Sequence, residues 1–437
     1  MATASHIELS PSSAGIYHVP DITSQSAKVA TQLLQDNHEK HHIYFNHEGF
    51  HNHIAHHLLA LFALGATPKE LQRGYDNNKG YQRSLFRVKE GIVKDMANPD
   101  SFKTYLGKEQ YYLDFLQFFQ QEIEAKGWQQ AVHQYLFSKT EASEDLLVRM
   151  FAGFYHPIIH LGYGVEFSQP AIVAEALAQA ATHDGWVAKF LLPAERAARS
   201  TFSPSKSLPT LLNEVQSNDK LRNSTHWDDS NKVRDGILVR APEEMIKVAA
   251  HYKVTPDSLV RKTAEMINSA IYFTAGSQRR DKEVRFDFFY MHSVTSSIFF
   301  STFINQPWLT IEDKCRLVEW KGRFDLALYV SRGNPQLDLA RIKNYQPKHP
   351  SHRWNEIFAR VDQLSDDGHS SKLIRAIAHG KQVSKAYDDE DAFMIKQDTF
   401  LQIAHMAIDS VEAGNPRWVR NTGFDQAWVN VPDRARL

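Results

Sequence analysis

Apolar residues recur at helical spacing along nearly the whole chain, from about Ser24 to the C-terminus. In residues 24–42 Val29 and Leu33 share one helix face, and Leu34 lies at its edge. Residues 287–304 are almost entirely apolar, which is typical of a helix that is buried on all sides. We find no sustained alternation of apolar and polar positions and no internal repeat. The pattern therefore predicts a mainly α protein built as a multi-helix bundle.

Capping residues mark the N-terminal ends of two predicted helices. Thr67 followed by Pro68 has the form of an N-cap followed by proline in the first helical position. Thr310 and Asp313 are spaced like a capping box. We therefore expect helices to begin at Pro68 and just after Thr310.

The polar and turn-forming residues divide the chain into parts. Residues 1–24 have the character of an irregular N-terminal arm, and 25–437 form one large all-α domain. Within it, the segment 196–239 is polar and rich in turn formers. We expect this segment to join two helical lobes, residues 25–195 and 240–437, with a metal site between them.

Composition and charge exclude several classes of protein. The 437 residues carry a net charge of −1, so nothing indicates binding to nucleic acid or to an anionic membrane. A lone cysteine, Cys315, cannot form an intramolecular disulfide. The N-terminus lacks the pattern of a secretory signal, and no apolar run is long enough to span a membrane, so we expect a soluble cytoplasmic protein.

Common catalytic and nucleotide-binding motifs are missing. The sequence contains no GxGxxG after a strand, no P-loop, no GxSxG, no HExxH and no CxxC. It therefore does not indicate a dinucleotide or triphosphate site of the usual kind, or a serine or cysteine hydrolase.

Histidines gather in one stretch of the chain. Of the 22 histidines, eight lie between His38 and His57. His53 is spaced i, i+4 from His57 and i, i+3 from His56, so both pairs share a helix face. The apolar run that follows indicates that this face enters a core. Because neutral imidazole is a common metal ligand, at least one of these three histidines is a candidate ligand.

Further histidines lie within apolar segments elsewhere in the sequence. In GFYHPIIHLGYG, Pro157 is expected to start or kink a helix, which makes His160 a better inward ligand than His156. His292 is the only imidazole of its buried run, and Thr295 follows on the same face. That hydroxyl either guides a substrate or bound oxygen, or bonds its own helix carbonyl.

A lysine accompanies the histidines near the C-terminal end. His369, Lys372 and His379 approximate one helix face, and His405 lies further along in apolar sequence. Burial of Lys372 would lower the pKa of its amine, and a neutral amine can take up carbon dioxide to form an anionic carbamate. Histidine ligands from several helices with no cysteine suit iron, zinc, copper or nickel.

Three motifs occurring in order resemble the questin oxidase-like family of fungal polyketide pathways. They are HNHIAHHLLALFALGA, GFYHPIIHLGYG and DDGHSSKLIRAIAHG, and the resemblance runs from about residue 40 to 410. It implies a non-haem Fe(II) centre that uses O2 as a co-substrate. The implied ligands are the nitrogens of four histidines and a carboxylated lysine: His57, His160, His292, His369 and Lys372. His53 or His56 remain alternatives to His57, and His379 to His369.

The resemblance also implies a reaction. We expect an oxygenase that opens the ring of a reduced anthraquinone polyketide in secondary-metabolite biosynthesis, with Thr295 guiding the substrate or the oxygen. Any need for NADPH would fall to a separate reductase that supplies the reduced substrate. Two alternatives stay open: a Baeyer–Villiger monooxygenase that itself uses NADPH or flavin, and a non-catalytic helical protein that binds aromatic molecules.

Overall fold

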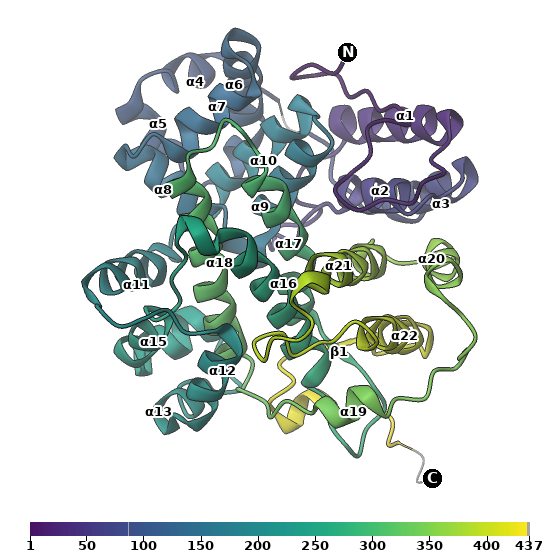
Figure 1. Ribbon diagram of the computed structural model, residues 1–437. Coiled ribbons are helices and arrows are strands. Elements are labelled where there is room, and N and C mark those ends of the chain that lie inside the picture. Colours follow the sequence, from purple (N-terminus) through teal and green to yellow (C-terminus); the bar gives the residue numbers. More distant parts are fainter. Residues whose placement is uncertain (86, 435–437) are drawn as a thin grey trace. The chain divides into compact units, whose positions relative to one another are not determined.

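A computed structural model describes residues 1–85 and 87–434 of the chain (Figure 1). Within these residues it contains 22 α-helices and one pair of very short strands, which confirms the mainly α prediction. The strands β1 (Phe286–Asp287) and β2 (Trp418–Val419) pair in parallel, with Phe286 opposite Trp418. No helix in the described part of the chain is both long and apolar enough to cross a membrane.

The chain forms two compact units. Unit 1 comprises residues 1–187, 305–309 and 362–372, and unit 2 comprises 188–304, 310–361 and 373–437. The helix α21 (His369–Ser384) begins in unit 1 and continues into unit 2 after Lys372. The segment 196–239, expected to link two lobes, belongs to unit 2 and includes α12 (Leu208–Ser217), α13 (Asp219–Arg222) and the start of α14 (Leu238–Arg240). The division into lobes at this segment stays a prediction.

The helices of unit 1 form two packed groups. The first is made of α1, α2 and α3, and the second of α6, α9 and α10, while α2 also packs on α9. Leu58, Leu59 and Phe62 of α2 are fully buried, as their apolar run predicted. The unit contains α1 (Ser24–Lys40), α2 (Ile54–Ala63), α3 (Pro68–Lys79), α4 (Glu90–Asp95), α5 (Pro99–Tyr105), α6 (Tyr112–Lys126), α7 (Trp128–Val132), α8 (Glu141–Arg149), α9 (Ala152–Glu166) and α10 (Pro170–Thr182).

Unit 2 is built around three long helices, α16, α17 and α18, which pack on one another. The apolar run 287–304 forms α17, and its residues from Tyr290 to Phe303 are buried. The unit contains α11 (Ala188–Ser200), α12 (Leu208–Ser217), α13 (Asp219–Arg222), α14 (Leu238–Arg240), α15 (Pro242–Ala249), α16 (Leu259–Gly276), α17 (Phe288–Ile304), α18 (Ile311–Ser331), α19 (Leu339–Lys343), α20 (Trp354–Asp362), most of α21 (His369–Ser384) and α22 (Thr399–Glu412).

Both helix starts marked in the sequence are confirmed. Thr67 forms a reciprocal capping box with Glu70, and Pro68 is the first residue of α3. At α18 the Thr310 hydroxyl accepts a hydrogen bond from the backbone N–H of Asp313. These caps satisfy amide groups that have no partner within the helix, and each contributes about 1 kcal/mol.

Candidate metal centre

Three buried histidines of unit 1 converge. His53 is the N-cap of α2, His156 belongs to α9, and His369 is the first residue of α21. One ring nitrogen of each lies within 4.8 Å of those of the other two. The Nε2 atoms of His53 and His156 are 2.8 Å apart. Residues far apart in the sequence are thus brought together as a nitrogen-rich group.

The partners of the opposite ring nitrogens fix the tautomers of all three rings. Asp367 accepts hydrogen bonds from Nδ1 of His53 at 3.1 Å and from Nδ1 of His369 at 2.5 Å. Nδ1 of His156 donates to the backbone carbonyl of Gly153 at 2.5 Å. A carboxylate and a carbonyl can only accept, so each Nδ1 carries the proton. In a neutral ring Nε2 then presents a lone pair.

Burial keeps the rings of His53 and His369 neutral at physiological pH. Burial, followed by the positive charge of Lys372, lowers the pKa of His53 to about 3. Burial also lowers the pKa of His369, although the charge of Asp367 opposes that effect. His156 is also buried, which disfavours its charged form. Two nitrogen lone pairs therefore face each other between His53 and His156, an arrangement that is repulsive without a cation.

The spacing of these two nitrogens matches that of metal ligands. Imidazole nitrogens bind first-row metals at about 2.0 to 2.1 Å, so two ligands at a right angle are about 2.9 Å apart. The observed Nε2 separation of 2.8 Å is close to this value. The His53, His156 and His369 group therefore fits a metal ion, and we refer to it as the histidine triad.

Lys372 lies one turn after His369 and is buried, with 3% of the residue exposed. Its Nζ has no hydrogen-bond partner among the described residues. Burial lowers the pKa of the Lys372 amine to about 8, while the carboxylates of Asp367 and Asp366 oppose that shift. About a tenth of the amine is then neutral at pH 7, and a neutral amine is the form that reacts with carbon dioxide.

A left-handed turn positions His156. Gly153, Phe154 and Tyr155 have φ values of 53°, 55° and 70°, all in the left-handed region. This conformation costs about 1 to 2 kcal/mol for each residue other than glycine. The turn places the Gly153 carbonyl against Nδ1 of His156, so the strain accompanies the contact that sets the His156 tautomer.

A second tight turn carries Asp366, Asp367 and His369. Gly368 has a φ of +89°, and an added Cβ would lie 2.5 Å from Cβ of His57. Asp366 stabilises the turn by accepting hydrogen bonds from the backbone N–H groups of Gly368 and Ser370. The motif DDGH thus requires glycine both for its backbone conformation and for its close approach to α2.

The Gly368→Ala substitution is therefore expected to lower the free energy of unfolding by roughly 2 to 4 kcal/mol, through the left-handed backbone and the clash with His57. Urea unfolding of the metal-free protein measures the change. The control is Gly80→Ala, because Gly80 has a φ of −69° and open space around its Cβ position. Equal stability of the two variants would contradict the argument.

The structure places the other predicted ligands of unit 1 next to the triad in sequence but in different contacts. His57 is buried, with Nε2 3.9 Å from Oδ1 of Asp366 and Nδ1 3.5 Å from the amide nitrogen of Asn78. His160 is also buried, as predicted. Its two ring nitrogens contact Nε2 of His56 at 2.9 Å and Oε2 of Glu175 at 2.6 Å. The roles of His57 and His160 as ligands stay predictions.

His292, Thr295 and His379 belong to unit 2. Nδ1 of His292 donates to the carbonyl of Phe288 at 2.6 Å, which leaves the lone pair of a neutral ring on Nε2. The Thr295 hydroxyl donates to the carbonyl of His292 at 3.4 Å, the helix contact weighed against a substrate role. Their roles at the metal stay predictions.

Sequence reasoning ranked His156 below His160 and did not single out Asp367. The hydrogen bond that fixes the His156 tautomer depends on the three left-handed residues before it. Helical periodicity in the sequence does not indicate such a turn. A signal for Asp367 was present in DDGH, where an acidic residue stands two positions before a candidate ligand. Carboxylates commonly orient metal-binding histidines in this way.

The comparisons with known proteins agree with the motifs. The family model described as questin oxidase-like matches residues 50–377. A Baeyer–Villiger monooxygenase of a Cryptosporiopsis species is 42% identical, with 99% of each chain covered. A Baeyer–Villiger oxidase of Pestalotiopsis fici is 39% identical over 99% of each chain. A questin oxidase of Aspergillus fumigatus is 39% identical, covering 99% of this chain and all of the relative. The chain belongs to the questin oxidase-like family.

Proposed function

We propose that the chain is an oxidoreductase that uses O2 and Fe(II) to open the ring of a reduced anthraquinone polyketide. The observation that carries the iron requirement is the histidine triad, in which two neutral lone pairs lie 2.8 Å apart inside a buried site. The reaction class is supported by relatives named as Baeyer–Villiger oxidases and questin oxidases, which align over nearly the full length of the chain.

Nε2 atoms of His53, His156 and His369 would hold the metal, with a carboxylated Lys372 as an anionic oxygen ligand. His57, His160 and His292 remain the further ligands implied by the family resemblance. When bound, Fe(II) supplies the one-electron chemistry that allows O2 to react with a reduced aromatic ring. Several nitrogens and one carboxylate-like oxygen are a suitable donor set for such an ion.

Residues of this chain prepare the site. Asp367 holds the Nδ1 protons of two histidines and so aims their Nε2 lone pairs. The neutral Nζ of Lys372 attacks carbon dioxide, an N–C bond forms, and one N–H proton leaves to solvent. The product is a carbamate with one negative charge, which offsets part of the charge of Fe(II).

The overall reaction balances without a further cofactor when the substrate is reduced. One oxygen atom of O2 enters the bond between a carbonyl carbon and its neighbouring ring carbon, and the other leaves as water. The hydroquinone form of the anthraquinone supplies the two electrons and two protons for that water and thereby becomes the ketone that accepts the oxygen atom. The product is a ring-expanded lactone, and a further water molecule hydrolyses its ester bond to open the ring. We also propose that a separate reductase supplies the reduced substrate and has no other role in the reaction.

His156→Ala tests the proposal. We expect the variant, loaded with Fe(II) without oxygen, to retain less than a tenth of the iron of the wild type and to lose O2 consumption with a chemically reduced anthraquinone. Mass spectrometry of bound metal and an oxygen electrode measure the two effects. His47→Ala is the matched control, because His47 belongs to the same histidine-rich segment but is exposed.

The same assay separates the alternatives. Turnover by metal-free protein that requires added NADPH or flavin would support a monooxygenase of the other type. Binding of the anthraquinone without O2 consumption would support a non-catalytic protein. Either result, or full activity of His156→Ala, would refute the iron proposal.

A further inference from the structure

Unit 2 contains a cavity of about 630 Å³ that the proposed oxygenase chemistry does not use. Its walls come from the segment before β1, from α19 and the residues after it, from α22, and from Arg434. The volume is in the range of small-molecule sites. Ala340, Ala413 and the nearly buried Val284 give it an apolar part.

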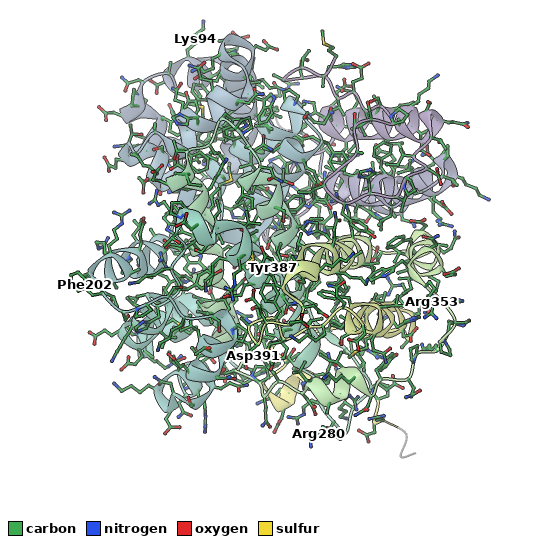
Figure 2. All side chains as sticks on the ribbon, viewed as in Figure 1. Lys94, Phe202, Arg280, Arg353, Tyr387 and Asp391 are labelled. Atoms are coloured by element: carbon green, nitrogen blue, oxygen red, sulfur yellow. The ribbon has the colours of Figure 1, made fainter. Side chains whose placement is uncertain are left out.

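Positive charge predominates among the residues that line the cavity. Three acidic residues are outnumbered by five basic ones: Arg280, Arg285, Arg341, Lys348 and Arg434. Arg280, labelled in Figure 2, is an exposed member of this group. Which of these charges have partners decides whether the cavity favours an anion.

Each of the three acidic residues has a cation as its partner. Asp338 contacts Arg280 at 2.8 Å, and Glu283 contacts Arg285 at 3.3 Å. The third, Asp409, pairs at 2.6 Å with an arginine of α20 that does not line the cavity. Each negative charge of the cavity wall is therefore neutralised by a positive charge in an ion pair.

Arg341, Lys348 and Arg434 are left without an ion pair to a carboxylate among the described residues, and Nζ of Lys348 donates to the backbone carbonyl of Asp409 at 3.2 Å. The Nη atoms of Arg341 donate only to backbone carbonyls, those of Arg280 at 3.1 Å and Lys282 at 2.6 Å. Its Nε is buried and has no hydrogen-bond partner in the described part of the chain. Burial, and then the charge of Arg434, lower the pKa of the Arg341 guanidinium. Three positive charges thus line the same cavity, and the Arg341 guanidinium has an unused donor.

We propose that this cavity binds a small organic oxyanion, a carboxylate or phosphate group on an apolar body, with Arg341 and Arg434 as its charged contacts. A guanidinium forms strong, directional bonds to such groups, and an anion here would relieve the repulsion between the two arginines. The apolar part of the wall accommodates a body larger than a free ion. The inference is independent of the proposed oxygenase function, whose triad belongs to unit 1.

Isothermal titration calorimetry on the full-length protein at constant ionic strength tests this. The probes are 2-naphthoate, an aromatic carboxylate, and inorganic phosphate. Arg341→Gln and Arg434→Gln are each expected to raise the Kd of the bound probe at least about 10-fold, the effect of losing one charged contact. Arg222→Gln on α13 is the charge-matched control, with a 55% exposed side chain outside the cavity.

The outcomes differ for each source of the oxyanion. Tighter binding of 2-naphthoate would assign a carboxylate ligand, and tighter binding of phosphate would assign a phosphorylated one. Should Arg341→Gln not fold, the variant at Arg434 decides, because Arg434 is exposed and its side chain makes no hydrogen bond with the residues that the structure describes. Absence of binding, or an equal loss in Arg222→Gln, would overturn the proposal.

Discussion

Replacing Asp367 with alanine is expected to lower the affinity for Fe(II) by about 10- to 100-fold while the protein remains folded. One carboxylate orients two rings of the histidine triad, through Nδ1 of His53 at 3.1 Å and Nδ1 of His369 at 2.5 Å. Without Asp367, the rings of His53 and His369 lose the hydrogen bonds that hold their protons on Nδ1. Both can rotate or move the proton to Nε2, which would block the lone pair.

Chelator-competition titration of Asp367→Ala with Fe(II) under argon measures the affinity. Nitrogen-15 NMR of the metal-free protein supplies a readout that a general loss of stability would not move, namely the tautomers of His53 and His369. Asp367→Asn should recover part of the affinity, because its amide oxygen can still accept from one ring. The control is Asp391→Ala, at the exposed position labelled in Figure 2. Unchanged affinity in Asp367→Ala would contradict the orienting role.

The helical architecture could be predicted from the sequence because it depends on local signals. The apolar runs of α2 and α17 and the caps Thr67 and Thr310 are read within a single turn or two of helix. Burial of His53, His56 and His57 followed from the apolar residues beside them. These features need no knowledge of how distant helices pack.

The composition of the triad could not be predicted in the same way. His53, His156 and His369 are separated by more than a hundred residues each, and no spacing rule links them. Helical periodicity favoured His160 as the inward residue of its motif, and it is indeed buried, but beside Glu175. His156 reaches the triad because the chain turns through three left-handed residues just before it. No pattern in the sequence predicts this conformation.

Lys372 is buried, and its amine has no hydrogen-bond partner among the described residues. A buried amine without a hydrogen-bond partner destabilises the folded state, because water hydrates the same amine in the unfolded state. An unperturbed lysine has a pKa of about 10.4, and the fold lowers the pKa of Lys372 to about 8. This difference corresponds to a penalty of roughly 3 kcal/mol at neutral pH.

Lys372→Met is therefore expected to make the metal-free protein more stable by roughly 1 to 3 kcal/mol at pH 7 and yet to abolish turnover. Below pH 8 the amine is protonated in both folded and unfolded states, so the wild type carries the full penalty. Between about pH 8 and 10.4 the unfolded state binds more protons, and the stability of the wild type rises with pH. The advantage of the variant should shrink over that interval.

Urea unfolding of both proteins at pH 7 and pH 10 measures this difference, with Lys94→Met as the control at the exposed lysine labelled in Figure 2. Carbon-13 NMR with labelled bicarbonate should show a carbamate signal in the wild type that is missing from Lys372→Met. A variant less stable than the wild type at pH 7 would contradict the burial argument. A variant that keeps its turnover would instead remove Lys372 from the proposed site, because its destabilising amine would then have no chemical use there.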